Sequence, residues 1–361
     1  MSLSAVVLAA VLPFLFVLMA TPAVSRIAYL LGAIDKPDSR KVHKVPTPRL
    51  GGLGIVVVVL GFLVSYVSKD PSLRGVLIGA LIISAVGIVD DIKRVSAGTK
   101  FLFQFAAAIV VVGYGFRVDF LTSPFDGIIA TDIFAVPLTL LWIVGVTNAV
   151  NLLDGLDGLA SGVISVSGLT LALIGWYQGV EVAVVGGLAL SSATAAFLKY
   201  NSYPASIFLG DTGALFSGYL LAVLSMIGMA KGATFVGLVV PIFILGVPIF
   251  DTLTTMARRF LQGKPIFQPD RGHLHHKLMD SGLGHVGTVY FVYIIAIVSG
   301  LVAVIISRVP ILYYLICMGC LLIVMVGTFD GGLTRLAEYV RHGTGLQPLD
   351  EAAATKEDRQ K

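Results

Sequence analysis

The chain has 361 residues, of which 57% are hydrophobic and 13% are charged. A soluble globular domain carries about 25% charged residues, so the composition excludes an ordinary soluble protein and predicts an integral membrane protein. The net charge is +4, and we expect no nucleic-acid partner. Cys317 and Cys320 share one apolar run without a flanking histidine, so we expect neither a disulfide nor a metal role for them.

Apolar stretches long enough to cross about 30 Å of hydrocarbon follow one another along most of the chain. We expect about 11 spans, at residues 3–24, 51–67, 75–89, 101–116, 133–146, 159–176, 182–198, 213–229, 235–250, 286–306 and 311–329. The pattern predicts an all-α fold, a polytopic membrane bundle that forms one multi-pass domain over residues 1–342. Residues 343–361 are polar and mixed in charge, and we expect a disordered tail.

The basic residues divide unevenly between the two sides of such a bundle. If alternate loops lie on one side, that side holds 20 of the 25 Lys and Arg. The positive-inside rule places this side in the cytoplasm, with the N-terminus outside and the C-terminus inside. Most of the aspartates near span ends fall on the same side. We therefore expect an active site at the cytoplasmic face of the cell membrane, built from loops 25–50, 90–100, 147–158, 199–212 and 257–285.

The first of these loops is strongly basic. Arg40, Lys41, His43, Lys44 and Arg49 lie within ten residues and precede a glycine pair at the beginning of a span. Basic side chains and a helix N-terminus suit an anionic head group. Ordinary positive-inside charge explains the individual lysines equally well, but it explains His43 less well.

The next two loops carry acids in close spacing. Asp90 and Asp91 are adjacent at the end of a span, so they cannot face the same side of a helix. One can then hold a metal while the other meets a second group, although a solvated helix end is the alternative. Asn151, Asp154 and Asp157 follow at intervals of three and share one face if a helix begins there. A turn with an Asp N-cap is the alternative for this stretch.

The fourth loop contains Asn201 and the sequence Phe208-Leu-Gly-Asp211-Thr-Gly. Asp211 is flanked by glycines and opens an apolar helix, so it is an N-cap, a metal ligand or both.

The last loop gathers Arg271, His273, His275 and His276. Zinc would need a fourth donor, and neither cysteine lies on this face. Histidine and arginine donors suit phosphate oxygens, and carboxylates suit Mg²⁺ held together with substrate phosphates. Together the loops indicate phosphoryl transfer, in which catalysis is largely positioning and charge neutralisation.

These motifs resemble those of the polyprenyl-phosphate N-acetylhexosamine-1-phosphate transferases of glycosyltransferase family 4. The resemblance covers roughly residues 34–283 and rests on Lys-Pro-Asp-Ser-Arg-Lys-Val-His, the adjacent acids with Lys100-Phe, Asn-Ala-Val-Asn-Leu-Leu-Asp-Gly-Leu-Asp-Gly-Leu, Phe-Leu-Gly-Asp-Thr-Gly and His-Leu-His-His, in this order. It implies a multi-pass enzyme that moves N-acetylhexosamine 1-phosphate from a UDP-sugar to a lipid phosphate, usually undecaprenyl phosphate. UMP would be released, and Mg²⁺ would be needed, with Mn²⁺ as a substitute.

The resemblance also implies roles for residues. Asp211 would bind magnesium, with Asp91 as a second candidate, and Asp90 and Asp91 would take part in catalysis and activate the lipid phosphate. Contacts with the nucleotide sugar are implied for Lys100 at a phosphate, Asn201 at the pyrophosphate, Asp157 and Phe208 at the uracil, Asn151 and Asp154 around that pocket, and Arg271, His273, His275 and His276 in a closing loop. The lipid phosphate would meet the basic residues Arg40, Lys41, His43 and Lys44.

The histidine loop distinguishes branches of this family. Pro-Asp-Arg-Gly-His-Leu-His-His resembles the branch that takes UDP-N-acetylglucosamine, and a phospho-MurNAc-pentapeptide transferase is the alternative. Asp251 fits the same branch but receives no role, because a helix-end acid paired with Arg258 explains it equally well. A route through an aspartyl phosphate stays open, and the glycines within the spans leave a homodimer open. A secondary transporter fits less well because the acids gather at one face. A CDP-alcohol phosphatidyltransferase fits less well because its signature continues differently after Gly158.

Overall fold

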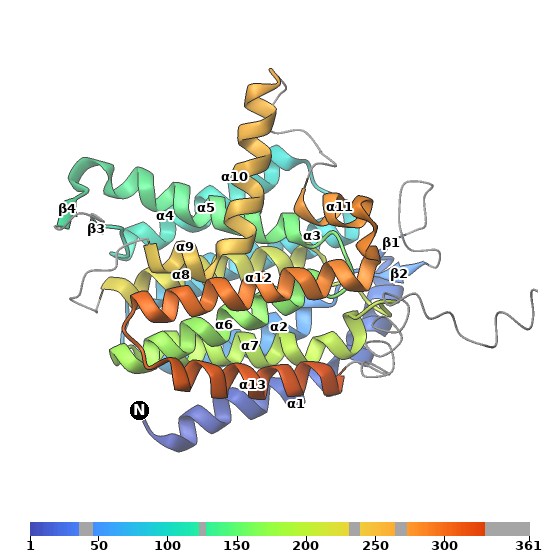
Figure 1. Cartoon of the computed structure of the whole chain (residues 1–361), viewed down its shortest axis with the longest axis horizontal. Helices are drawn as coiled ribbons and strands as arrows, with labels where there is room; N and C mark the ends of the chain where they lie inside the picture. The colour runs from blue at the N-terminus through green and yellow to red at the C-terminus, as the bar shows by residue number, and fades with distance from the viewer. Residues whose placement is uncertain (36–45, 123–127, 231–238, 264–272, 329–361) are drawn as a thin grey trace, which may run out of the picture.

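A computed structural model gives the structure of the chain and describes residues 1–35, 46–122, 128–230, 239–263 and 273–328 (Figure 1). Helices dominate the described residues. They are α1 (Leu3–Leu31), α2 (Gly52–Val67), α3 (Leu73–Lys93), α4 (Ala97–Gly113), α5 (Ala135–Leu153), α6 (Leu159–Gln178), α7 (Glu181–Asn201), α8 (Gly210–Ala230), α9 (Val239–Ile244), α10 (Gly246–Leu261), α11 (Leu274–Leu278), α12 (Gly284–Ile306) and α13 (Ile311–Thr328). Two antiparallel pairs complete the fold, β1 (Ile34–Asp35) with β2 (Thr47–Pro48) and β3 (Phe120–Thr122) with β4 (Ile128–Ala130).

Within the described ranges, eight helical segments are long and apolar enough to cross a membrane, and α2 and α4 are shorter apolar helices. The prediction of an all-α, polytopic membrane protein is therefore confirmed. The number of spans and the sides on which the termini lie stay predictions.

Burial separates central helices from peripheral ones. In the apolar stretch of α8, 94% of the residues are buried, and in those of α6 and α7 83% are buried. In the apolar stretches of α1 and α13, only 17% and 28% of the residues are buried. Leu and Ile side chains on α1 and α13 stay exposed, as is typical of helices that face lipid. The central helices α6, α7 and α8 thus form the interior on which the site is built.

The expected span at residues 235–250 is wrong as a single helix. Its first residues lie outside the described ranges, and the helix then breaks at Leu245, between α9 and α10. Pro248 explains the break, because a proline ring clashes with the carbonyl group four residues earlier, here that of Ile244. After the break, α10 rises away from the bundle (Figure 1).

The described parts of the loops expected at one face lie at one end of the bundle. In Figure 1, β1, β2 and α11 lie together at this end, and β3 and β4 lie at the opposite end. Arg94 after α3 pairs with Asp35 of β1 at 3.5 Å, which joins two of these loops. At the far end, Lys69 after α2 pairs with Glu181 of α7 at 3.1 Å. The chemistry-bearing residues that the structure describes therefore share one end.

Candidate active site

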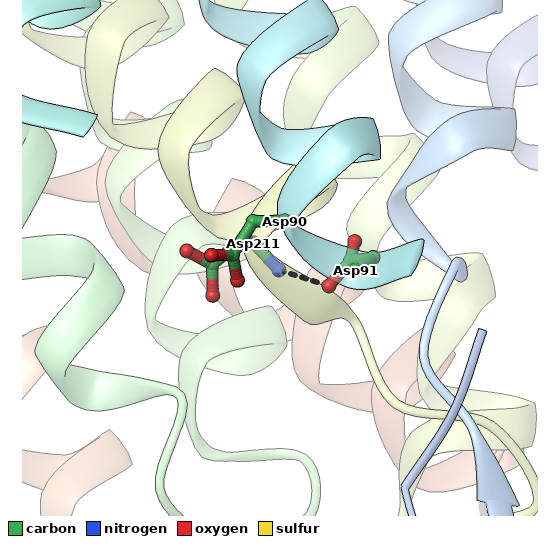
Figure 2. Close-up of side chains that lie close together, drawn as sticks. All are labelled: Asp90, Asp91 and Asp211. Atoms are coloured by element: carbon green, nitrogen blue, oxygen red, sulfur yellow. Dashed lines mark hydrogen bonds between the residues drawn. The ribbon is translucent and has the colours of Figure 1, made fainter. Parts of the chain in front are cut away.

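Asp91, near the end of α3, caps the N-terminus of α8. Its Oδ1 accepts the N–H of Asp211 at 3.0 Å (Figure 2). Its Oδ2 accepts the N–H of Thr212 at 3.0 Å and the Thr212 hydroxyl at 2.6 Å. The first turn of a helix has N–H groups without partners and a partial positive charge, so a carboxylate from another helix stabilises it. Asp91 thus fastens the beginning of α8 to the end of α3, and both of its oxygens are occupied.

Asp90 meets a different set of groups. Lys100, in the first turn of α4, has its Nζ 3.3 Å from Asp90 Oδ1 and 2.7 Å from Asp211 Oδ2. Asp90 also accepts the N–H of Val95 at 2.8 Å. Figure 2 shows the carboxylates of Asp90 and Asp211 side by side and that of Asp91 set apart. The adjacent acids therefore have different partners, Asp91 the first turn of α8 and Asp90 the ammonium group of Lys100, as expected for neighbours on a helix.

Glycines allow the backbone of the first loop to approach this cluster. Gly210 has a φ of +71°, and a Cβ there would lie 1.9 Å from the carbonyl oxygen of Arg49. A Cβ on Gly52, at the beginning of α2, would lie 2.1 Å from the Cα of Gly213. Only glycine permits such contacts, so these residues set the distance between α2 and α8 at the site.

A turn joins α5 to α6. α5 ends at Leu153 with Asp154 as its C-cap, and α6 begins after Gly158, which has a φ of +80°. The expectation that Asn151, Asp154 and Asp157 share one face of a helix beginning there is therefore wrong. Asn151 lies in the last turn of α5, and the two aspartates lie beyond its end, where the left-handed Gly158 separates the helices. The alternative of a turn is confirmed, but its N-cap is Gly158 and not an aspartate.

The charges of the acid cluster act on the carboxyl group of Asp154. Burial, and after it the negative charges of Asp211 and Asp91, raise the pKa of its carboxyl from 3.8 to about 7, against the opposing effect of Arg49. A cation bound at the cluster would favour the ionised form of Asp154. The turn is therefore sensitive to the charge held by α3 and α8.

Asn201, at the end of α7, holds this turn in place. Its Oδ1 accepts the N–H of Gly158 at 3.2 Å and the hydroxyl of Ser161 at 2.8 Å, and its amide nitrogen donates to the carbonyl oxygen of Ile207 at 3.1 Å. Asn201 is only 2% exposed. This geometry favours a positioning role over the pyrophosphate contact that the family resemblance implies.

Asp157 faces the segment that precedes α8. Its Oδ2 accepts the N–H of Ala205 at 2.9 Å, and its carbonyl oxygen lies 3.4 Å from Nε2 of His285. The His285 ring stacks on Tyr203 with ring centroids 4.3 Å apart. Phe208, in the same segment, is partly buried and donates its N–H to the carbonyl oxygen of Pro48 at 2.8 Å. The residue expected at the uracil thus lies beside His285, whose ring stacks on Tyr203.

The histidine segment is anchored by Asp251 of α10, to which the sequence assigned no role. Asp251 Oδ2 accepts Nδ1–H of His273 at 3.0 Å, and Oδ1 accepts the N–H of Leu274 at 2.7 Å. Burial raises the pKa of the Asp251 carboxyl, but these hydrogen bonds outweigh burial and hold it below its ordinary value. Asp251 therefore connects α10 to the beginning of α11.

His275 reaches the turn between α5 and α6. A Cβ on Gly155 would lie 2.8 Å from Nε2 of His275, so the ring packs directly on this glycine. The rings of His273 and His276 lie 5.9 and 4.3 Å from the His275 ring, measured between centroids. His275 is 3% exposed, and within the described residues its Nδ1 has no hydrogen-bond partner. A buried polar atom of this kind suits contact with a ligand.

Arg271 and the four lipid-phosphate candidates Arg40, Lys41, His43 and Lys44 lie outside the described residues. Conversely, sequence reasoning missed Thr212 and His285, and it named Asp251 without a role. The hydroxyl beside Asp211 in Gly-Asp-Thr-Gly signals Thr212, but nothing in the local pattern indicates His285 or the partner of Asp251.

Comparison with known proteins identifies the family. Residues 73–229 match the model of "Glycosyl transferase family 4". A Bacillus subtilis (strain 168) protein, named as a probable undecaprenyl-phosphate N-acetylglucosaminyl 1-phosphate transferase, is 43% identical over 327 residues, which cover 89% of this chain and 90% of the relative. The chain belongs to glycosyl transferase family 4.

More distant relatives of this family 4 chain have related names. The decaprenyl-phosphate N-acetylglucosaminephosphotransferase of Mycobacterium tuberculosis (strain ATCC 25618 / H37Rv) is 33% identical over 311 residues, 76% of each chain. The undecaprenyl-phosphate alpha-N-acetylglucosaminyl 1-phosphate transferase of Escherichia coli (strain K12) is 27% identical over 281 residues, 74% of this chain and 75% of the relative.

The acids of the family 4 chain fit a divalent cation. One ligand oxygen each from Asp90, Asp91 and Asp211 lie within 4.8 Å of one another. Oxygen donors suit Mg²⁺ or Mn²⁺ rather than metals that prefer sulfur. Because both Asp91 oxygens bind α8, the geometry favours Asp90 and Asp211, the two carboxylates bridged by the Lys100 ammonium group.

Proposed function

We propose that this protein transfers N-acetylglucosamine 1-phosphate from UDP-GlcNAc to undecaprenyl phosphate, or a similar polyprenyl phosphate, and releases UMP. The observation that carries the proposal is the convergence of Asp90, Lys100 and Asp211 with the Asp154–Asp157 turn and His275 at one end of the bundle. The B. subtilis relative, which matches over nine-tenths of its length, is named as a probable undecaprenyl-phosphate N-acetylglucosaminyl 1-phosphate transferase, which supports the proposal. The product would begin a cell-envelope glycopolymer at the cytoplasmic face.

In the proposed reaction, an oxygen of the lipid phosphate attacks the β-phosphorus of UDP-GlcNAc in line. A new P–O bond forms to the lipid phosphate, and the bond between the β-phosphorus and the oxygen that leaves with UMP breaks. A phosphate monoester has a second pKa of about 6, so the attacking group is largely a dianion at pH 7 and needs no strong base. The contribution of Asp90 is then orientation and charge more than proton removal.

The residues of the site divide this work. Lys100 balances the charge of Asp90 and Asp211 and would turn to a substrate phosphate as that charge is neutralised. Mg²⁺ held by Asp211 and Asp90 would supply neutralisation of the charge that develops on the pyrophosphate. The His275 ring lies against Gly155 in the Asp154–Asp157 turn, and from there it would donate a hydrogen bond to the UDP-sugar.

The donor is proposed to be UDP-GlcNAc rather than the peptidoglycan precursor. The relatives described above all have N-acetylglucosamine in their names. The order of residues in the histidine loop, Arg271, His273, His275 and His276, favours the same donor. Membership of a transferase family disfavours the transporter alternative.

UMP release by the purified protein in detergent tests the proposal. Undecaprenyl phosphate and Mg²⁺ are supplied with UDP-GlcNAc or with UDP-MurNAc-pentapeptide, and Asp211→Asn serves as the inactive control. We expect turnover with UDP-GlcNAc alone, lost in the variant and after chelation of the metal. Turnover with the pentapeptide donor alone would reverse the choice of donor, and a folded protein without UMP release from either donor would contradict the reaction.

The same preparation tests a single displacement. Without the lipid acceptor, labelled UMP should not exchange into UDP-GlcNAc, because no covalent intermediate on the protein is proposed. Exchange at a rate comparable to turnover would instead support the aspartyl phosphate route.

A further inference from the structure

Arg49 lies beside Asp91 at the acid cluster, whereas Lys100 lies between Asp90 and Asp211. Its guanidinium group is 3.8 Å from Asp91 through Nη2 and 3.8 Å from Asp35 through Nη1. Its positive charge also acts on the carboxyl of Asp154 in the turn after α5. Two cations thus flank the acids, Lys100 between Asp90 and Asp211, and Arg49 beside Asp91.

The backbone around Arg49 is held on both sides. The Arg49 N–H donates to the carbonyl oxygen of Ala33 at 3.0 Å. The N–H groups of Gly51 and Gly52 donate to the carbonyl oxygens of Phe208 and Leu209 at 3.0 and 2.8 Å. Together with the close approach of Gly210, these bonds place Arg49 rigidly with respect to α8.

The side chain, in contrast, has unused hydrogen-bonding capacity. It is 20% exposed, and among the described residues its guanidinium group makes no hydrogen bond, because both carboxylates lie beyond hydrogen-bond distance. A guanidinium group has five N–H donors in a planar fork that matches two phosphate oxygens. A partly buried arginine that is held in place but has free donors is suited to bind an anion.

Neutralisation of Asp91 alone would explain Arg49 less well. Asp91 already accepts three hydrogen bonds from α8, whereas Arg49 lies 3.8 Å from it and makes no hydrogen bond to it. The segment that carries Arg49 also directly follows the basic run from Arg40 to Lys44 and directly precedes α2. The Arg49 backbone also bonds to Ala33, directly after the lipid-facing helix α1, so a phosphate attached to a lipid would reach this edge of the cluster from the side of α1.

We propose that Arg49 binds the phosphate group of the polyprenyl phosphate acceptor and holds it beside the acid cluster. The inference rests on the proposed function, because it names the residue that receives the acceptor in that reaction. Arg49 forms no covalent bond in it; its two N–H groups hold non-attacking phosphate oxygens while the third attacks. The negative Asp35 and Asp91 limit the affinity, which lets the product leave.

Steady-state kinetics of Arg49→Gln and Arg49→Lys test this assignment, with Arg94→Gln as the matched control. Arg94 also pairs with Asp35, at 3.5 Å, but its side chain is 71% exposed and it makes no ion pair with Asp91 among the described residues. Charge-assisted hydrogen bonds to phosphate are worth enough for about a tenfold change in affinity. We expect Arg49→Gln to raise KM for undecaprenyl phosphate about tenfold or more, with KM for UDP-GlcNAc nearly unchanged.

The control variants separate binding from charge balance. Arg49→Lys keeps the charge but loses the fork, so it should show an intermediate KM, and Arg94→Gln should behave as the wild type. Equal kinetics of Arg49→Lys and the wild type would reduce Arg49 to a neutralising charge and overturn the proposal. An increase confined to KM for UDP-GlcNAc would also overturn it, because the anion bound would then belong to the donor.

A thermal-shift measurement without donor covers the cases in which turnover cannot be interpreted. Undecaprenyl phosphate should raise the Tm of the wild type and of Arg94→Gln, but much less that of Arg49→Gln, while the Tm values without lipid stay similar. An equal rise in all three would contradict the role of Arg49 even if the wild type turns over. If the lipid effect depends on Arg49 but the wild type releases no UMP, the proposed function fails and the assignment of the phosphate site stands.

Discussion

Asp90 and Asp91 are adjacent, but their surroundings predict separate effects on activity and on stability. Asp91 is buried and accepts three hydrogen bonds from α8. Asp91→Ala would leave the N–H groups of Asp211 and Thr212 without partners inside the protein, and we expect a loss of about 1–3 kcal/mol in the free energy of unfolding. Thermal unfolding in detergent measures this loss.

Asp90→Asn is the complementary variant. The amide keeps an acceptor for the Val95 N–H but loses the charge that faces Lys100 and Asp211. We expect turnover to fall at least about 100-fold with little change in Tm, because electrostatic groups at a phosphoryl-transfer site contribute on that scale. If Asp90→Asn had a lowered Tm but normal turnover at a temperature where it is folded, this division of roles would be contradicted.

The raised pKa of Asp154 predicts a pH dependence of stability. A carboxyl whose folded pKa of about 7 exceeds its ordinary value of 3.8 binds more protons in the folded protein, so stability falls as pH rises from about 4 to 7 and levels off above that. Asp154→Asn imitates the protonated form and removes this loss. With a metal chelator present, the Tm of the variant minus that of the wild type should grow from pH 5 to pH 8.

A Tm difference that stays constant over this range would mean that Asp154 is already ionised in the folded protein. Added Mg²⁺ provides an internal control. A cation at Asp90 and Asp211 lowers the pKa of Asp154, so the pH dependence of the difference should weaken.

At the scale of elements, one connection joins α10 to the histidine segment. Asp251→Asn removes the charge that holds His273 and weakens the cap of Leu274. We expect KM for UDP-GlcNAc to rise about tenfold, because a displaced α11 no longer presses His275 against Gly155, while KM for the lipid acceptor changes little. Thr254→Ala, on the same helix, is the control, because the bonds of the Thr254 hydroxyl to described residues all lie within α10. Equal changes in both KM values would indicate general disruption instead.

The elements show what local pattern can and cannot predict. Long apolar runs predicted the helices of the bundle because burial in lipid requires them, whatever their neighbours are. The end of α5 at Leu153 was missed because three polar residues at intervals of three fit a helix and a turn alike. The break at Leu245 was also missed, although Pro248 is visible in the sequence, because proline is common within membrane helices.

The sequence predicted which residues belong to the candidate site better than it predicted which of them contact one another. Alternation of the loops brought Asp90, Asp154, Asp211 and His275 to one end, as the structure confirms. The pairing of Asp91 with Thr212, or of Asp251 with His273, joins residues 121 and 22 positions apart. Which helix end meets which depends on packing in three dimensions, and no periodicity in the chain encodes it.

For the whole molecule, the orientation in the membrane is a prediction that labelling can test. In a background of Cys317→Ser and Cys320→Ser, a single cysteine is placed at Ser68, after α2 at the far end, or at Ala97, at the beginning of α4 near the site. Both positions are exposed. A membrane-impermeant thiol reagent should label Ser68→Cys on intact cells and Ala97→Cys only after permeabilisation. The reverse pattern would place the site outside the cell.

Because Asp91 caps α8, hydrogen–deuterium exchange can follow motions of the site in the absence of substrate. The amide protons of Asp211 and Thr212 are held by a carboxylate of another helix, so deuterium replaces them only when α3 and α8 separate. The amide of Leu274 depends on Asp251 and on a shorter helix, and its exchange reports the opening of the histidine side alone. The two rates thus distinguish a separation of α3 from α8 at the acid cluster from an opening of the histidine segment. A Cβ on Gly87 of α3 would lie 2.7 Å from the Cα of Thr212, and this close packing predicts that the first rate is the slower.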